Sequence, residues 1–314
     1  MIPDSHVRQR VSLPLDMKIQ WSRRVIESWY EHWAGMVYVA FSGGLDSTAM
    51  LHLVRSYYPA VPAVFWNTGL ELPEIVAAVK ATEWCEIRRP AMSFRQVIDR
   101  YGYPVVSKRI AQYVHEVQVA RPGSSVPALR LTGIRKNGTY SRNAKIPARW
   151  QFLIDAPFRI SDKCCDVMKK RPAEQYEKQT GRRPFVGVTV GESDQRWLTY
   201  RQFGCNMFGA KRSRSWPIAI WTRADVLAYI HRHDLPVASV YEMGYTRTGC
   251  AYCAFGAHAR DPNQFELLAE THPRLWRYCM DTCGMRAVLR FCRIRDGSER
   301  QMQLFPALRV REFP

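Results

Sequence analysis

The sequence lacks any apolar run long enough to cross a membrane. A membrane-spanning helix needs about 20 consecutive apolar residues, and no stretch of the 314 residues approaches that length. The segment from Met1 to Lys18 also carries several charges and has no apolar core of the kind found in secretory leaders. These absences predict a cytoplasmic protein with no membrane association.

Acidic residues are scarce relative to basic ones. The chain has 28 Asp and Glu against 46 Lys and Arg, which leaves a formal net charge of +18. A surplus of this size favours a polyanionic partner, nucleic acid first and RNA rather than DNA. The alternative is a basic active site within a solubilising surface, because net charge alone constrains function weakly.

The sequence contains no internal repeat, no GxxxxGK[ST] motif and no GxGxxG motif. What is present is an alternation of short apolar runs with helical patterns, which is typical of a parallel sheet with crossover helices. We therefore predict an α/β fold with a parallel five-stranded sheet and helices on both faces. The expected strands are Val37–Phe41, Ala60–Trp66, Cys85–Arg89, Phe185–Val190 and Pro217–Trp221. A helix follows the last of them, and Thr222 to Asp225 resembles its capping box.

Three parts of the chain are expected. Residues 1–36 form an N-terminal segment and helix, residues 37–235 the nucleotide-binding α/β domain, and residues 236–314 a cysteine-bearing helical lobe. Residues 121–147 are rich in Gly, Pro, Ser, Asn and basic side chains. Because irregular segments of this length are usually functional or disordered, we predict a basic flap over the site, with a disordered surface insertion as the alternative.

A glycine-rich turn follows the first expected strand. It reads SGGLDS from Ser42 to Ser47 and leads directly into a helix. Glycines allow a close approach of the backbone, and a helix N-terminus offers free N–H groups to an anion. We predict a phosphate cradle formed by Ser42, Gly43, Gly44 and Ser47. Asp46 would hold Mg²⁺ beside the phosphates, whereas in the alternative interpretation it only caps the helix.

Polar residues also follow two other expected strands. Ligands of open α/β sheets bind beyond the carboxyl ends of the strands, so we expect Thr68, Gly69 and Glu192 to contact a nucleotide. Ser193 and Arg196 join Asp46 as candidate catalytic residues, since a guanidinium group can neutralise developing phosphate charge. Two lysines, Lys108 and Lys163, are weaker candidates for that role.

Four of the nine cysteines form two pairs, Cys164-Cys165 and Cys250-x-x-Cys253. Adjacent cysteines suit a single tetrahedral zinc ion poorly, because neighbouring side chains diverge, whereas a cluster with separate iron corners accommodates them. We predict a [4Fe–4S] cluster, with zinc or free thiols as alternatives. Cys205 competes with Cys164 as the fourth ligand.

In this order along the chain, these motifs resemble the phosphoadenosine-phosphosulfate (PAPS) reductase-like family of the PP-loop ATP pyrophosphatase superfamily, including its phage, plasmid and CRISPR-associated members. DNA phosphorothioation and tRNA thiolation enzymes are related to it. The resemblance implies an adenine nucleotide alpha hydrolase-like, Rossmann-like fold. It also implies ATP, or the sulfonucleotides APS or PAPS, as the bound nucleotide, and a [4Fe–4S] cluster on the four paired cysteines.

Three departures from the family pattern separate the functional hypotheses. The SGGLDS loop is intact, whereas sulfonucleotide reductases have a degraded one; Asn67 replaces a frequent Asp; and neither Ala307–Pro314 nor Cys283-Gly284 provides the reductases' Glu-Cys-Gly-x-His setting. The first hypothesis is therefore ATP-dependent adenylation of a nucleic acid or small molecule, followed by transfer from a sulfur donor. The second is sulfonucleotide reduction with a thioredoxin-like reductant. The third is a non-catalytic nucleotide- or RNA-binding accessory, for example of a CRISPR system.

Overall fold

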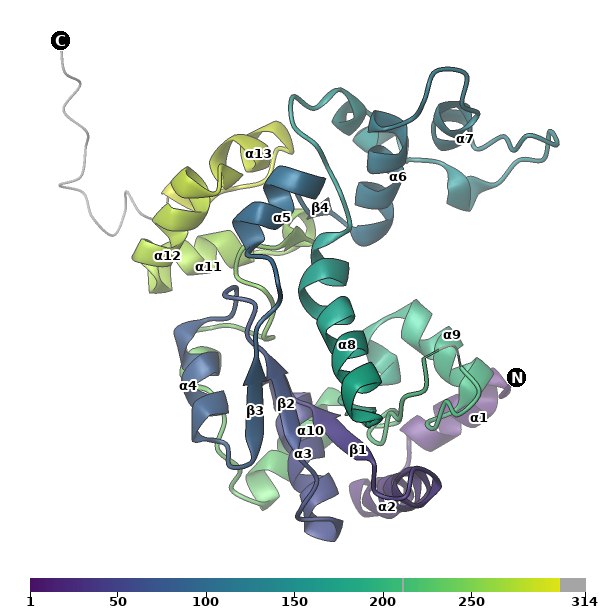
Figure 1. Cartoon of the computed structure of the whole chain (residues 1–314), viewed down its shortest axis with the longest axis vertical. Coiled ribbons are helices and arrows are strands. Elements are labelled where there is room, and N and C mark those ends of the chain that lie inside the picture. Colours follow the sequence, from purple (N-terminus) through teal and green to yellow (C-terminus); the bar gives the residue numbers. More distant parts are fainter. Residues whose placement is uncertain (211, 300–314) are drawn as a thin grey trace.

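The central element is a parallel sheet of four strands. The computed structural model describes residues 1–210 and 212–299, and its sheet has the order β3-β2-β1-β5 (Figure 1). In register, Val39 of β1 lies beside Ala63 of β2 and Phe185 of β5. The predicted parallel α/β fold is confirmed. The strands are β1 (Val37–Ala40), β2 (Ala63–Trp66), β3 (Cys85–Arg88) and β5 (Arg183–Val186).

The predicted fifth strand at Pro217–Trp221 is wrong. Residues 217–220 form turns, in which the N–H of Ala219 donates to the carbonyl of Trp216 and the N–H of Trp221 donates to that of Ile218. The run is apolar because all of it is buried. A short buried run reports burial and not conformation, so its composition did not distinguish a turn from a strand.

The two faces of the sheet are covered differently. Val37 and Val39 point into the main core, on the side of α2 (Leu15–His32), α3 (Leu45–Tyr57) and α10 (Arg223–Arg232). Tyr38 and Val64 point to the opposite face, where they meet Tyr176 of α8 (Arg171–Thr180) in a smaller cluster. This alternation follows the period of two along a strand. The remaining helices around the sheet are α1 (Asp4–Val11), α4 (Pro73–Ala81) and α9 (Asp194–Phe203).

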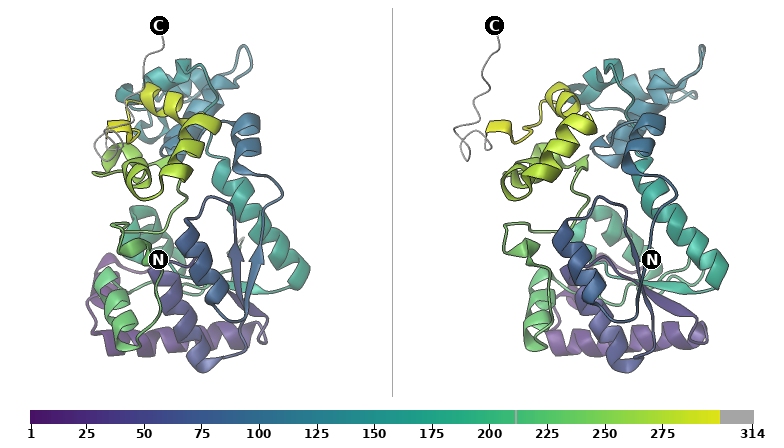
Figure 2. Two further views of the ribbon diagram at one scale, coloured as in Figure 1. Left: turned by 90° about the vertical axis from the view of Figure 1, so that its left-hand side faces the viewer. Right: turned by 60° about the vertical axis from the view of Figure 1, so that its left-hand side comes forward.

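A second lobe lies above the carboxyl end of the sheet in Figure 1. It combines segments far apart in sequence, because β4 (Val105–Val106) pairs in parallel with β6 (Ala254–Phe255). Figure 2 shows the helices between β3 and α8 and the helices that follow β6 side by side at the top of the molecule. The helices are α5 (Phe94–Tyr101), α6 (Lys108–Gln118), α7 (Val126–Thr132), α11 (Gln264–Thr271), α12 (Pro273–Arg277) and α13 (Met285–Phe291).

Short helical segments complete the secondary structure. Single-turn and 3₁₀ segments cover Arg142–Ala144, Ala148–Asp155, Val190–Glu192, Ser239–Tyr241 and Ala257–Ala259, and π-helical segments cover Asp166–Lys170 and Tyr278–Thr282. Within residues 1–210 and 212–299, no helix has the length and apolarity needed to span a bilayer. The segment Ala307–Pro314 lies outside the described residues.

A buried ion pair ties α2 to α10. Lys18 is only 2% exposed, and its Nζ donates to Asp225 Oδ2 at 2.6 Å. Asp225 is the third residue of the predicted capping box, which is confirmed by the hydrogen bonds that it exchanges with Thr222. Burial raises the pKa of Asp225, but the hydrogen bonds from Lys18 and Thr222 outweigh that effect and lower it overall.

We expect Asp225→Asn to destabilise the protein by about 3 kcal/mol, because removing one partner of a buried pair leaves the other charge uncompensated. Asn keeps the size and the capping oxygen, so the change isolates the charge. The lowered pKa means that the stabilisation is present at neutral pH and is lost as the pH falls through that value. Urea unfolding measures the change in the free energy of unfolding. The control is Asp16→Asn, which breaks an exposed ion pair with Arg232 and should lower the free energy of unfolding by less than about 1 kcal/mol.

Candidate functional site

The loop Ser42–Ser47 connects β1 to α3 at the carboxyl edge of the sheet. Gly43 has a φ of +69°, which an L side chain rarely adopts. The hydroxyl of Ser47 accepts a hydrogen bond from the N–H of Ser42 (3.2 Å) and donates to the carbonyl of Gly44 (2.9 Å). Ser47 thus holds the shape of the loop, while Ser42 is exposed at its rim.

Residues from the distant C-terminal part of the chain cover this loop. The N–H of Leu45, in the first turn of α3, donates to the hydroxyl of Tyr241 at 3.1 Å. A Cβ added to Gly44 would collide with Oγ1 of Thr248, so glycine is required here by close packing. Neither contact has a signal in the sequence, because almost 200 residues separate Tyr241 from the loop.

Asp46 lies half-buried at the start of α3. Burial raises its pKa, and the positive charges of Arg223 and Arg196 oppose this rise. Among the described residues its carboxylate makes no ion pair within 4 Å. The carboxylate therefore has free oxygens for a cation. One carboxylate combined with water and phosphate oxygens is the usual environment of Mg²⁺, so the donor set fits that ion.

The turn after β5 supplies Glu192, Ser193 and Arg196. The Glu192 carboxylate accepts from the N–H of Thr189 at 3.0 Å and forms an ion pair with Arg196. The hydroxyl of Ser193 accepts from the N–H of Arg196 at 3.3 Å and caps α9. Burial lowers the pKa of the Arg196 guanidinium, and the nearby Arg247 lowers it further. Glu192 and Ser193 thus make hydrogen bonds within the turn itself, and Arg196 lies near Asp46.

Thr68 and Gly69 form the turn after β2. Thr68 is buried, and its hydroxyl donates to the carboxylate of Glu71 at 2.8 Å. Gly69 is exposed and its N–H donates to the side-chain carbonyl of Asn67 at 3.0 Å. Because an amide oxygen accepts here as well as a carboxylate would, the turn tolerates Asn67 in place of the frequent Asp.

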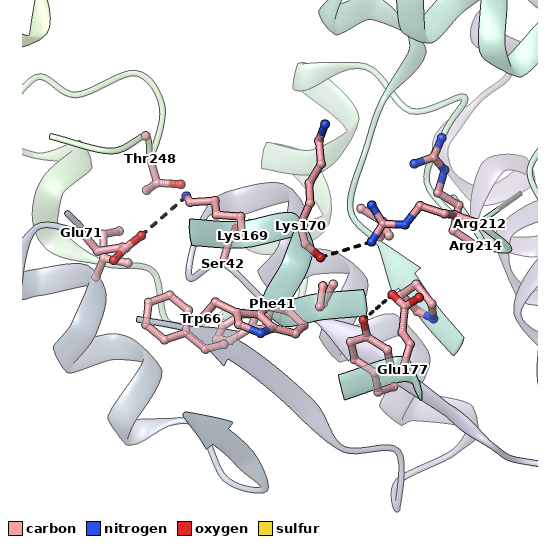
Figure 3. A pocket seen from close by; sticks show the side chains of 18 of the residues that line it. Phe41, Ser42, Trp66, Glu71, Lys169, Lys170, Glu177, Arg212, Arg214 and Thr248 are labelled. Atoms are coloured by element: carbon pink, nitrogen blue, oxygen red, sulfur yellow. Dashed lines mark hydrogen bonds and ion pairs between the residues drawn. The ribbon is translucent and has the colours of Figure 1, made fainter. Parts of the chain in front are cut away.

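A cavity of about 340 Å³ opens beside the loop, between the sheet and α8. Figure 3 shows Phe41 and Trp66 along one side and the basic side chains of Lys169, Lys170, Arg212 and Arg214 around the others. Nε1 of Trp66 is buried and has no hydrogen-bond partner among the described residues. An aromatic slot with cationic walls and a free N–H suits a nucleobase joined to an anionic chain.

None of residues 121–147 lines this cavity, nor do Lys108 and Lys163. The segment expected to be a flap instead packs against α6, where Arg130 forms an ion pair with Glu116 and the N–H of Ile146 donates to the carbonyl of Arg130. The expectation of a flap over the site is therefore not what the structure shows. Loop composition predicted an irregular basic segment but carried no information about which element it packs on.

The four paired cysteines line one small second cavity. Cys164, Cys165, Cys250 and Cys253 share its walls with apolar side chains and Lys169. Burial raises the pKa of Cys164, Cys250 and Cys253, the last to about 12, and the neighbouring thiols contribute to the rise. By contrast, the competing ligand Cys205 lies against Trp21 and Tyr200, away from this cavity.

Four thiols are the donor set that a structural zinc ion or a [4Fe–4S] cluster takes, so the chemistry of these cysteines fits either group. Across residues 1–210 and 212–299, no group of three or more His, Cys, Asp or Glu side chains is arranged to hold a metal ion. The four cysteines line one cavity, and the [4Fe–4S] cluster stays a prediction with zinc as the alternative.

Lys169 lines both cavities. Its Nζ lies 3.5 Å from Glu71 Oε1, and Glu71 in turn accepts from Thr68. Burial lowers the pKa of Lys169, but Cys250 and Glu71 outweigh that effect and raise it overall. The sequence motifs did not point to Glu71, Lys169 or Trp66. Two signals were available: Lys169 stands one helical turn after Cys165, and Trp66 directly precedes the turn after β2.

Comparison with known proteins yields one family. Residues 36–150 and 135–255 match the family described as "phosphoadenosine phosphosulfate reductase domain". An adenosine 5′-phosphosulfate reductase of Anoxybacillus flavithermus is 21% identical over 256 residues, which covers 81% of this chain and 88% of that protein. An uncharacterized protein of Methanocaldococcus jannaschii is 26% identical over 254 residues, which covers 80% of this chain.

The chain spans only 42% of the M. jannaschii protein's length. Among solved structures, a phosphoadenylyl-sulfate reductase from Candida auris in a phosphate complex is 14% identical, with a TM-score of 0.42. The match covers 80% of this chain and 96% of that one.

Proposed function

The chain belongs to the phosphoadenosine phosphosulfate reductase domain family, and from this premise we propose that it is an ATP-dependent enzyme that adenylates an acceptor for sulfur transfer. The observation that carries the proposal is the intact SGGLDS loop, in which Ser42 lines a cavity of about 340 Å³ and Asp46 lies near Arg196 and Arg223. The acceptor is a hydroxyl or carbonyl oxygen of a nucleic acid or a small molecule.

Different parts of the nucleotide would contact the cavity and the loop. The adenine base would enter the slot between Trp66 and the cationic wall, and the phosphates would lie beside Ser42, the residue of the loop that lines the cavity. Mg²⁺, held by Asp46, would neutralise phosphate charge when bound. Arg196 and Arg223, with Arg247 nearby, would stabilise the negative charge that develops on the leaving pyrophosphate.

The proposed reaction has two steps. The acceptor oxygen attacks the α-phosphorus of ATP, the bond to the β-phosphate oxygen breaks, and pyrophosphate leaves with that electron pair. A sulfur nucleophile from the donor then attacks the acceptor carbon, and AMP leaves with the former acceptor oxygen. When bound, the [4Fe–4S] cluster would hold the sulfur or fix the second lobe against the site. Because Lys169 lines both cavities, it would orient groups passing between them.

The second candidate function is sulfonucleotide reduction. It is favoured by the adenosine 5′-phosphosulfate reductases among the relatives and by the cysteine cavity beside the nucleotide cavity. The thiol nucleophile is the weak point of this candidate. Cys283 is only 2% exposed, and burial raises the pKa of its thiol, so it is poorly placed to attack a substrate.

Two product assays on the same anaerobic preparation separate the candidates. With ATP·Mg²⁺ and a pool of transfer RNA or small hydroxylated acceptors, we expect pyrophosphate and AMP in equal amounts. With adenosine 5′-phosphosulfate or its 3′-phosphate and reduced thioredoxin, we expect no sulfite. Sulfite release would make the chain a reductase, and nucleotide binding without either product would make it an accessory protein.

We expect Trp66→Leu to weaken ATP binding at least about tenfold, because stacking on a base is worth about 1–3 kcal/mol. The matched control is Trp84→Leu, since Trp84 is 74% exposed and lines no part of the cavity. Isothermal titration with a non-hydrolysable ATP analogue measures both variants. Equal affinities in the two variants would place the base elsewhere.

A further inference from the structure

Residues 121–150, which we call the arm, form a folded projection on the outer side of α6 (Figure 1). After α7 the chain makes a tight hairpin, in which Ile134 and Tyr140 pair in an antiparallel bridge. The N–H of Arg135 donates to the carbonyl of Thr139 at 2.9 Å, and the N–H of Gly138 returns to the carbonyl of Arg135 at 2.8 Å. The arm therefore presents its side chains on a hydrogen-bonded frame.

The arm carries only positive charge. It contains no Asp or Glu, and of its basic residues only Arg130 forms an ion pair within the described part of the chain. Cations gathered on one surface without acidic partners repel one another, and a polyanion removes that repulsion while releasing its own counterions. The unpaired basic residues are Arg121, Arg135, Lys136, Arg142, Lys145 and Arg149.

An aromatic side chain stands among these cations. Tyr140 is 64% exposed at the base of the hairpin, and its partner Ile134 is 51% exposed. Exposed aromatic rings beside phosphate-binding cations are the usual means of binding single strands, because unpaired bases can stack on them. A duplex hides the faces of its bases, so the combination favours a single strand.

Basic side chains continue from the arm towards the phosphate loop. The guanidinium of Arg149 lies 5.6 Å from the ring centre of Trp150, which meets His258 edge-to-face at 5.0 Å. Arg260 follows His258 two residues later and donates a hydrogen bond to the side-chain oxygen of Gln264 at 3.0 Å. Beside Arg247, the carbonyl of Thr246 accepts from Arg223 at 3.1 Å.

We propose that the arm binds a single-stranded polynucleotide, with phosphates on Arg135, Lys136 and Arg142 and an unpaired base on Tyr140. Binding of the strand depends on the side chains of the arm and needs no nucleotide at the loop. The further step, in which the bound strand is the acceptor that is adenylated at the loop, rests on the proposed function. The two parts fail separately, because binding is measured without ATP.

The test uses the full chain and fluorescein-labelled strands of about 20 nucleotides: oligo(U), oligo(dT) and a duplex RNA of the same length. Anisotropy is recorded between about 50 and 200 mM KCl. We expect both single strands to bind more tightly than the duplex. Tighter binding of oligo(U) than of oligo(dT) would identify RNA through its 2′-hydroxyls, and equal binding would identify the shared backbone and bases.

The variants separate charge from stacking. Arg135→Glu with Lys136→Glu should weaken single-strand binding at least about tenfold and flatten its salt dependence. Tyr140→Ala should weaken binding about tenfold without changing the salt dependence. Arg24→Glu with Lys80→Glu is the matched control, since both residues are exposed, without ion pairs and on α2 and α4. The proposal would be overturned if the arm double variant and the control double variant bound single strands with equal affinity. It would also be overturned if the unmodified protein bound the duplex more tightly than the single strands.

Discussion

Protein carrying Asp46→Asn is expected to release pyrophosphate from ATP about 1,000-fold more slowly than the unmodified protein. Asn keeps the size of the side chain but removes the negative charge that would hold Mg²⁺, and no helix cap is lost, because the N-cap residue of α3 is Gly44, which has no capping side chain. Asp46 is half-buried and is the single acidic residue of the SGGLDS loop, so the loop itself offers no second carboxylate to take its place. Glu192 is already engaged with Thr189 and Arg196.

The rate is measured under saturating ATP and Mg²⁺, and titration with MgCl₂ shows whether the variant has lost its affinity for the metal. The matched control is Asp234→Asn. Asp234 is exposed and has a φ of +46°, a conformation that Asn also tolerates. If Asp46→Asn kept the full rate and the same Mg²⁺ requirement, the loop would bind a nucleotide without activating it.

The second large effect concerns the cysteine cavity. We expect the unmodified protein, purified without oxygen, to contain about four iron and four sulfide per chain, as a [4Fe–4S] cluster requires. Cys250→Ser should reduce both to less than one, because Cys250 is one of the four thiols that line the cavity. The loss should also lower the thermal stability, since metal binding to a folded site contributes to folding free energy.

Two matched variants test the choice of ligands. Cys205→Ser removes a buried thiol beside Trp21 and Tyr200, and Cys85→Ser removes a half-buried thiol in β3. Both should keep the full iron content. Iron loss in Cys205→Ser would make Cys205 a ligand in place of Cys164. Stoichiometric zinc without iron would replace the cluster by a single ion.

The SGGLDS loop combines local features that its sequence predicts with contacts that its sequence does not predict. The strand, the turn and the helix were all predicted from residues 37–54, because glycine conformation and the apolar pattern are local properties. The contacts of Tyr241 and Thr248 with this loop were not predicted. They depend on how the chain returns to the site after almost 200 residues, which no local pattern encodes.

The same distinction explains the errors. Pro217–Trp221 was predicted as a strand because it is apolar, but it is apolar because it is buried in turns. Residues 121–147 were predicted over the site because they are basic and irregular, but they pack on α6. In both cases the composition reported the environment of the segment correctly, whereas its conformation or position depended on the neighbouring elements.

By itself, the sequence determined the α/β class, the family and the local chemistry of each motif, because these depend on residue type and on short-range spacing. Only the tertiary structure decided which motifs meet. It placed four thiols around one cavity, put Lys169 on the walls of both that cavity and the larger one beside the loop, and left Asp46 without an ion-pair partner in the described chain. These juxtapositions follow from the packing of segments far apart in sequence, including the pairing of β4 with β6, and packing is a property of the whole chain.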